Sequence, residues 1–174
     1  KDLVRPGGRL VIAIYNRQRI WQLSDRVDNV VSAHPWRMAT DQDTIPIRNL
    51  YNNLVPGLVQ QIEPFSTQRP RGMVFYLDGD LLGYVELKYG HRGIWALPFI
   101  HPDTEDISTC LSDLIVKIPG RRSRPIYACI RSYQSWLEPA TEELGAVSGP
   151  RQAVMVRQLV VQQNAVRAFS LPAL

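Results

Sequence analysis

Three side chains between residues 86 and 133 are of types that can hold or move a proton. Glu86 lies in the apolar run 81–87 and can act as a general base if it faces a cleft. His101 follows the run 93–100, and the pKa of an imidazole suits proton transfer near neutral pH. Tyr133 lies at the start of a predicted helix, where its hydroxyl can donate a hydrogen bond. We therefore take Glu86, His101 and Tyr133 as the candidate catalytic residues.

Each of the three candidates also has an ordinary structural interpretation. Side chains alternate across a strand, so Glu86 could equally face solvent. His101 precedes a proline and is compatible with a simple polar residue at a strand end. Tyr133 is compatible with a tyrosine partly buried in the core. The elements that surround these residues must decide between the two interpretations.

The positions of Glu86 and His101 depend on a predicted three-stranded antiparallel meander. Its strands are expected at 73–77, 81–87 and 93–100. The pair Asp78-Gly79 lies between the first two strands, and an Asp-Gly pair in that context is typical of a type I′ turn, which needs positive φ at both central positions. An acidic segment follows His101 and leads into an amphipathic helix. A junction of strand, loop and helix is a common place for a ligand.

The rest of the chain supplies further helices and strands around the meander. We expect a strand at 37–40, helices at 45–54 and 58–62, a helix from 107 to about 118, a strand at 125–130, a helix at 133–144 and a strand at 153–161. Asp41 or Asp43 is expected to cap the first helix, and Gly145 to end the last one. The crossover from 93–100 through a helix to 125–130 predicts parallel pairing of those two strands.

Residues 1–35 precede this arrangement. Segments 9–16 and 20–27 alternate in polarity around a polar turn at 17–19, which predicts a β-hairpin. An isolated hairpin is marginal in water, so we expect this one to extend the sheet of the domain at 36–165 or to pair with a second chain. The extension at 1–35 could also be the end of a preceding domain. Residues 166–174 are expected to form a C-terminal tail.

Four short motifs follow one another between residues 36 and 161. They are Arg37-Met38-Ala39-Thr40-Asp41-Gln42-Asp43, Gly83-Tyr84-Val85-Glu86-Leu87, Ile100-His101-Pro102 and Glu143-Leu144-Gly145-Ala146. In this order they resemble motifs of the GNAT superfamily of acyl-CoA-dependent N-acyltransferases. The resemblance implies an α/β (α+β) fold with a mixed, mostly antiparallel central sheet flanked by helices, here with an extra N-terminal β-hairpin. It also implies that the strands at 93–100 and 125–130 splay apart.

The resemblance implies acetyl-CoA as the cofactor, but the loop that would bind its pyrophosphate is degenerate. The residues expected to contact the cofactor are Phe99, Ile100, His101, Ser108 and Thr109. In the family, a glycine-rich loop at this point cradles the phosphates with backbone N–H groups. Here no glycine occurs between residues 93 and 120, and Asp103, Glu105 and Asp106 oppose an anion. The same carboxylates can cap the following helix. We expect acetyl-CoA to bind weakly or not at all.

The positions that carry catalysis in the family are also altered. Residues 94–100 contain no carboxylate to act as the general base, and the position of the family's tyrosine, counted back from Gly145, is Thr141. Two functions remain open. One is an N-acetyltransferase for a small-molecule or peptide amine, with residual activity through the three candidate residues. The other is a structural, ligand-binding or protein-binding half of a tandem acetyltransferase, beside a preceding GNAT domain or in a homodimer.

Length, charge and cysteine content indicate which partners and which cellular compartment to expect. A length of 174 residues suits one domain, and the net charge of +4 is dispersed, so we expect no nucleic-acid partner. The longest uncharged apolar stretch, 93–100, is far shorter than the ~20 residues of a membrane-spanning helix, so we expect no membrane association. Cys110 and Cys129 lack the spacing of a disulfide framework or a zinc site. We therefore expect a cytoplasmic protein without a metal.

Overall fold

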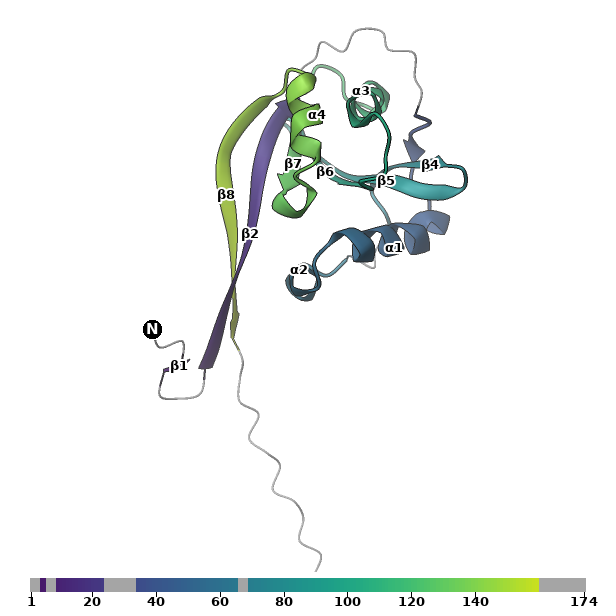
Figure 1. The fold of residues 1–174 in the computed structure, drawn as a ribbon. Coiled ribbons are helices and arrows are strands. Elements are labelled where there is room, and N and C mark those ends of the chain that lie inside the picture. Colours follow the sequence, from purple (N-terminus) through teal and green to yellow (C-terminus); the bar gives the residue numbers. More distant parts are fainter. Residues whose placement is uncertain (1–3, 6–8, 24–33, 66–68, 160–174) are drawn as a thin grey trace, which may run out of the picture.

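The computed structural model describes residues 4–5, 9–23, 34–65 and 69–159, with side chains described for 17–23, 34–65 and 69–153. The strands are β1 (Val4–Arg5), β2 (Arg9–Leu23), β3 (Arg37–Met38), β4 (Gly72–Leu77), β5 (Asp80–Tyr89), β6 (Ile94–Ile100), β7 (Ile126–Arg131) and β8 (Val147–Leu159). The helices are α1 (Thr44–Leu54), α2 (Gly57–Ile62), α3 (Ile107–Lys117) and α4 (Leu137–Glu143), with 3-10 turns η1 (Asp41–Asp43) and η2 (Ser132–Gln134). Helices α1 and α2 lie on one face of the sheet, and α3 and α4 lie on the other (Figure 1).

The strands form one mixed sheet in the order β8-β2-β7-β6-β5-β4-β3, with β1 pairing along the outer end of β2. The expected meander is confirmed, because β4, β5 and β6 pair consecutively and antiparallel. Its first turn has φ of 52° at Asp78 and 93° at Gly79, as a type I′ turn requires. The parallel pairing of β6 with β7 is also confirmed. A mixed and mostly antiparallel sheet between two helical layers is the fold class that the sequence predicts.

The two parallel strands separate toward their C-terminal ends. Their pairing runs from Ile94 opposite Ile126 to Ala96 opposite Ala128 and goes no further, although β6 continues to Ile100 and β7 to Arg131. The backbone of β6 after Ala96 therefore faces β7 without ladder hydrogen bonds. This splay lies next to both candidate regions described below.

The N-terminal region differs in part from expectation. The predicted turn at 17–19 is wrong, because β2 runs through it as one continuous strand, while the part of the predicted hairpin at 24–27 lies outside the described residues. An N-terminal hairpin does exist, but it joins β1 to the start of β2. The expected extension of the sheet is confirmed, since β2 pairs with β7 over Gln18–Arg131 to Leu23–Ile126 and with β8 on its other side.

Two boundaries near the C-terminus also differ. The helix expected at 133–144 begins as the turn η2, and regular helix starts only at Leu137. The strand expected from 153 begins at Val147, although Pro150 cannot donate to a ladder. A register shift between Arg19 and Trp21 of β2 leaves Pro150 without a ladder partner, and β8 is an edge strand, where proline is tolerated. Residues 160–161 of the predicted strand lie outside the described residues.

Two of the motif segments have structural roles. The Asp43 carboxylate accepts hydrogen bonds from Arg37 at 2.6 and 2.8 Å, from the Thr40 N–H at 2.7 Å and from the Tyr76 hydroxyl at 2.7 Å. Asp43 thus ties β3 and β4 to the start of α1. Asp43 is the N-cap residue of α1, as expected, but its side chain makes no capping hydrogen bond to that helix, and Thr40 is the N-cap residue of the preceding turn η1. A Cβ at Gly83 would lie 2.5 Å from the Phe75 ring, so only glycine fits there without displacing that ring.

Candidate ligand groove and the N-terminus of helix α3

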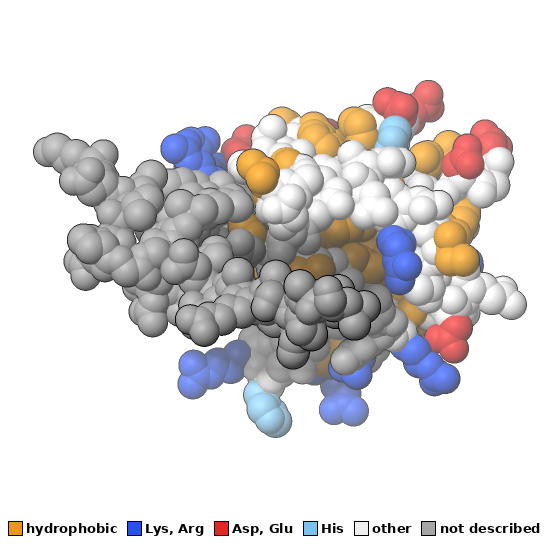
Figure 2. Space-filling view, turned by 90° about the horizontal axis from the view of Figure 1, so that it is seen from below, with side chains coloured by type: hydrophobic (Ala, Val, Ile, Leu, Met, Phe, Trp, Pro, Cys, Tyr) orange, Lys and Arg blue, Asp and Glu red, His pale blue; other side chains and the backbone are white. Residues whose placement is uncertain are grey.

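A groove of about 1080 Å³ opens on the α1 and α2 side of the sheet. Its aromatic lining residues are Tyr51, Phe65, Tyr84, Tyr89, Phe99 and Tyr133. Its charged lining residues are Glu63, Arg69, Arg71, Glu86, Lys88 and Arg131. Figure 2 shows this side of the molecule from below, with hydrophobic side chains near the centre and Lys and Arg side chains along the lower edge of the view. Clefts of this size and composition are typical of small-molecule sites.

The aromatic wall of the groove is assembled from α1, the sheet and the segment after α2. Tyr51 has its ring centroid 5.4 Å from that of Phe65 and 5.6 Å from that of Phe99. The Phe99 ring is stacked on Tyr84 at 6.2 Å. The Tyr51 hydroxyl donates to the Glu63 carbonyl, which holds the segment after α2 against α1. Since Tyr84 and Phe99 stand directly opposite each other on β5 and β6, the pairing register itself brings the two rings together.

Arg131 ends β7 and is the most buried of the cations that line the groove. Its Nη2 donates to the Glu63 carboxylate at 3.0 Å, and only 12% of its side chain is exposed. Its Nε and Nη1 atoms are buried and have no hydrogen-bond partner among the described residues. A guanidinium has five N–H donors, so this one is engaged far below its capacity. An under-engaged buried donor is open to a partner other than the described residues.

Burial raises the pKa of several groove tyrosines. It raises the pKa of Tyr84 to about 12, and the nearby Glu86 carboxylate adds to the effect. Burial also raises the pKa of Tyr133 and of Tyr51, although the Arg131 charge acts in the opposite direction on both. All three hydroxyls therefore keep their protons near neutral pH and are able to donate a hydrogen bond.

The groove brings together two of the three candidate catalytic residues. Glu86 and Tyr133 both line it, which favours the cleft-facing interpretation of Glu86 over full exposure to solvent. The Glu86 carboxylate lies 3.2 Å from the Lys88 ammonium. The Tyr133 hydroxyl makes no recorded hydrogen bond within the described part of the chain. Tyr133 lies in η2 rather than in the regular helix that the sequence predicts.

His101 lies outside this groove. Its Nδ1 accepts a hydrogen bond from the Asp103 N–H at 3.3 Å, and the Asp103 carboxylate lies 3.5 Å from the same nitrogen. The imidazole is thus turned toward its own loop on the far side of the strand end. The structure does not bring His101 together with Glu86 and Tyr133.

The loop after β6 ends in a self-contained helix cap. Asp106 has φ of 47°, in the left-handed region, and its carboxylate accepts from the Thr109 N–H at 3.1 Å and from the Ser108 hydroxyl at 3.0 Å. The hydrogen bonds from Thr109 lower the pKa of Asp106. The expectation that an acidic residue of this loop caps the helix is confirmed for Asp106. The carboxylate occupies the place where an anion would meet the N-terminus of α3.

The splay between β6 and β7 is bridged by a side chain. Gln134 is fully buried, its Nε2 donates to the Pro98 carbonyl at 2.9 Å, and its Oε1 accepts from the Ile100 N–H at 3.2 Å. These are the β6 backbone groups that face away from the ladder with β5. Ile100, one of the expected cofactor contacts, therefore already has a partner for its backbone N–H.

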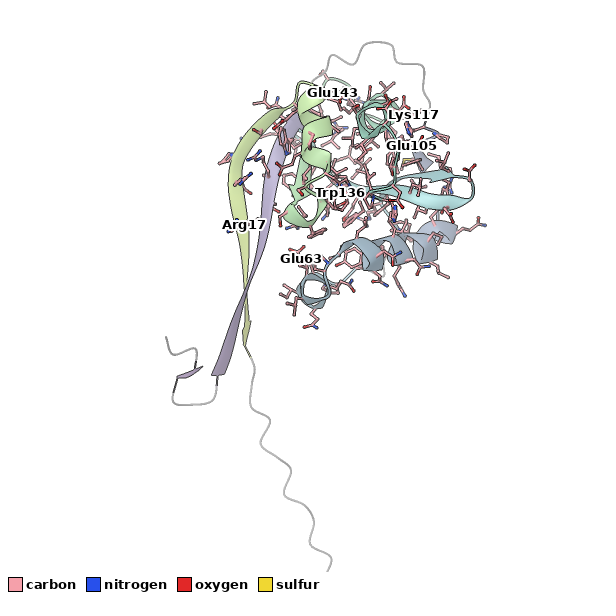
Figure 3. All side chains as sticks on the ribbon, in the orientation of Figure 1. Arg17, Glu63, Glu105, Lys117, Trp136 and Glu143 are labelled. Atoms are coloured by element: carbon pink, nitrogen blue, oxygen red, sulfur yellow. The ribbon has the colours of Figure 1, made fainter. Side chains whose placement is uncertain are left out.

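The groove and the loop lie on opposite sides of the sheet. Figure 3 shows Glu63 beside α2 on one side and Glu105 near α3 on the other. Of the five residues expected to contact a cofactor, Phe99 lines the groove, Ile100 binds Gln134, His101 faces its own loop, and Ser108 and Thr109 bind Asp106. These five residues do not converge on one open surface.

Three further side chains are buried and cannot reach a substrate. Thr141 is fully buried, and its hydroxyl donates to the Leu137 carbonyl within α4. Cys129 is buried, its thiol donates to Gln18 at 3.2 Å, and burial raises its pKa, as expected for an inert thiol. Burial raises the pKa of Cys110 to about 12.

Sequence reasoning missed Arg131, Glu63 and Gln134. Arg131 and Glu63 are 68 positions apart, so no local spacing connects them. The available signal was a cation placed directly after a continuous apolar strand, where a charge needs a specific partner. Gln134 carried no signal, because its hydrogen bonds depend on how far β6 and β7 separate.

Within the described residues, no helix is long and apolar enough to cross a membrane. The same part of the chain holds no group of three or more His, Cys, Asp or Glu side chains arranged to bind a metal ion.

Comparison with known proteins supports the fold. No family model matches the sequence, and no curated protein is similar to it in sequence. A functionally unknown conserved protein from Staphylococcus epidermidis superposes with a TM-score of 0.57 at 8% identity, over 85% of this chain and 64% of its own. An acetyltransferase of the GNAT family from Colwellia psychrerythraea gives 0.58 at 11% identity, over 84% of this chain and 57% of its own.

A third solved structure, assigned to the GNAT family and from Novosphingobium aromaticivorans, gives a TM-score of 0.62 at 12% identity, over 91% of this chain and 70% of its own. The chain thus spans less than two thirds of the length of the first two structures. At these identities the likeness concerns the fold, and the fold of this chain is GNAT-like.

Proposed function

We propose that this chain is a GNAT-fold domain that binds acetyl-CoA weakly or not at all and that uses the groove on its α1 and α2 side to bind a small ligand. The runner-up is a slow acyl-CoA-dependent N-acetyltransferase. The proposal concerns this domain only, since the solved structures similar to it include longer chains.

The observation that carries the proposal is the Asp106 carboxylate bound to the Thr109 N–H at the start of α3. A helix N-terminus binds phosphate through free N–H groups and the positive end of its dipole. Here an internal carboxylate uses one of those groups and neutralises part of that potential. An incoming pyrophosphate must displace it.

Electrostatic repulsion between the loop carboxylates and a pyrophosphate also weakens the binding of acetyl-CoA. Asp103 and Glu105 are exposed on the same loop as Asp106. A pair of like charges ~5 Å apart costs on the order of a few kcal/mol at an effective dielectric near 20, and less once salt screens it. Even about 1.4 kcal/mol corresponds to a tenfold loss of affinity.

The hydrogen bonds of Gln134 are a second reason to expect weak binding of acetyl-CoA. Its side chain hydrogen-bonds both Pro98 and Ile100 on the free edge of β6. A cofactor arm lying along that edge would have to replace two buried hydrogen bonds. Both routes by which β6 and α3 could hold acetyl-CoA are therefore occupied by the chain itself.

The runner-up rests on one feature, the presence of Glu86 and Tyr133 in the same groove. In such a transfer the amine nitrogen attacks the thioester carbonyl, Glu86 accepts the amine proton, and the departing thiolate takes a proton from Tyr133. The raised pKa of Tyr133 makes it a weak acid for that last step.

Calorimetric titration with acetyl-CoA tests the proposal. We expect no saturation up to about millimolar cofactor, and a micromolar dissociation constant would overturn it. The triple variant D103N/E105Q/D106G removes three charges and supplies a glycine at the left-handed position. It should bind acetyl-CoA more tightly than the wild type if the loop is the obstacle.

A control variant separates the effect of charge in the loop from the effect of the net charge of the protein. Asp80 is exposed at the β4–β5 turn, away from α3. D80N removes one carboxylate there and should leave acetyl-CoA binding unchanged. Equal gains for D80N and the triple variant would show that net charge, and not the loop, sets the affinity.

A further inference from the structure

We propose that the groove binds a small aromatic carboxylate, whose carboxylate pairs with Arg131 and whose ring lies against the aromatic wall. The proposal rests on the proposed function, because it names the class of ligand for the same groove.

The charge of the groove selects an anion. Arg69, Arg71, Lys88 and Arg131 line it together with two carboxylates, Glu63 and Glu86, so its formal charge is +2. Lys88 and Arg69 stand at the exposed rim, where they pair with Glu86 at 3.2 Å and with Asp41 at 3.5 Å. Arg131 alone is mostly buried. The rim of the groove thus attracts an anion, and Arg131 can bind it in the buried part of the groove.

Arg131 supplies the specific contact. Only one of its hydrogen bonds, to Glu63, is recorded, while Nε and Nη1 are buried without a partner among the described residues. Arginine matches a carboxylate through two parallel N–H···O bonds. A ligand carboxylate that takes the place of Glu63 at Nη2 and also reaches Nη1 would replace one hydrogen bond with two. Glu63, with about a third of its side chain exposed, can turn to solvent.

Tyr133 can add a neutral donor to the same carboxylate. It follows Arg131 by two residues, both side chains line the groove, and the Arg131 charge acts on the Tyr133 hydroxyl. Burial keeps this hydroxyl protonated, so it donates rather than repels. A cation and a neutral donor side by side favour a carboxylate over a neutral amide.

The walls of the groove favour an aromatic ring beside that carboxylate. The rings of Phe65 and Phe99 lie around Tyr51 at centroid distances of 5.4 and 5.6 Å, and Tyr84 is stacked on Phe99 at 6.2 Å. Ring pairs in this range gain stabilisation beyond the area they bury. A phenyl group in the groove would find the same geometry.

The test compares two probes that differ only in charge at one end, 3-phenylpropionate and 3-phenylpropionamide. Their binding to the 174-residue chain is measured by calorimetry and by ligand-observed NMR at low salt. We expect the carboxylate to bind at least about tenfold more tightly than the amide. Equal affinity for the two probes, or no binding of either, would overturn the proposal.

Three variants test the role of Arg131. R131K keeps the charge but loses the two-pronged geometry, and it should weaken 3-phenylpropionate binding about tenfold. E63Q removes the competing carboxylate and should tighten binding, which a merely structural role for Glu63 would not produce. R48Q removes a cation from the exposed side of α1 that does not line the groove and should have no effect.

The outcomes separate this proposal from the proposed function. A loss of affinity in R131K together with a gain in E63Q supports the carboxylate site, provided that thermal unfolding shows both variants folded. An unchanged affinity in both would overturn it. Tight acetyl-CoA binding by the wild type would overturn the proposed function alone, because that titration reports on the other side of the sheet.

Discussion

The two sides of the sheet differ in how completely their polar groups are engaged. On the α3 side, Asp106 binds the N–H of Thr109, and Gln134 binds both free backbone groups of β6. On the α1 side, Arg131 keeps two buried nitrogens without a partner in the described chain, and the Tyr133 hydroxyl has no recorded one. The ligand site proposed above lies on the side with unengaged groups, and the helix N-terminus on the other side is already occupied by the chain's own carboxylate.

The largest expected effect lies on the groove side, where Asp43 holds the start of α1. D43N removes a charge whose carboxylate is only 3% exposed and which accepts from Arg37, Thr40 and Tyr76. We expect a loss of about 2–4 kcal/mol in the free energy of unfolding, measured by urea denaturation at neutral pH. D41N, which alters an exposed pair with Arg69 at 3.5 Å, is the control and should change stability by less than ~0.5 kcal/mol. Similar losses in both variants would contradict this assignment.

The second largest effect is expected on the α3 side of the sheet, at Gln134. Q134L keeps the approximate volume of the side chain but leaves the Ile100 N–H and the Pro98 carbonyl buried without partners. We expect a loss of about 1–3 kcal/mol in unfolding free energy, with faster hydrogen exchange at the Ile100 amide. The control is Q152L, since Gln152 is exposed and its side-chain oxygen accepts a hydrogen bond from the Gln18 side-chain amide at 3.1 Å on the protein surface. An unchanged exchange rate at the Ile100 amide would show that Gln134 does not protect this N–H group at the splay between β6 and β7.

Local features of the sequence were sufficient to predict most of the fold. The Asp78-Gly79 pair predicted a turn that needs positive φ at both positions, and the strand–helix–strand order predicted the parallel pairing of β6 with β7. The position of β2 between β7 and β8 could not be predicted in this way. It depends on pairing across more than a hundred residues, as between Gln18 and Arg131, and no nearby pattern specifies such a partner.

The site was predicted less completely, for a related reason. Asp106 acts locally, through a hydroxyl and an N–H two and three residues away, so the capping role was visible in the sequence. The Arg131–Glu63 pair depends on where α2 ends relative to β7, and Gln134 depends on the angle between two strands. Side chains that act across elements become visible only once the elements are packed.

The smallest expected effect is at Asp106, and its pH dependence distinguishes a cap from an exposed charge. D106A removes the acceptor for the Thr109 N–H and places alanine at φ of 47°, so we expect a loss of about 1 kcal/mol at neutral pH. D106N retains an oxygen acceptor and a side chain that tolerates the left-handed region, and it should lose less.

The direction of the pH dependence follows from the lowered pKa of Asp106 in the folded chain. A carboxylate whose folded pKa is depressed stabilises the fold above its unfolded pKa of about 3.9, and this contribution is lost as the pH falls through the folded value. The gap in melting temperature between wild type and D106A should therefore be widest near pH 7 and narrow below about pH 4. The gap between D106N and D106A should change little over the same range, because neither side chain titrates. If the wild-type advantage persisted unchanged at the lowest pH at which the chain folds, the charge of Asp106 would not contribute to the cap, and the electrostatic part of the barrier to phosphate at α3 would have to come from Asp103 and Glu105.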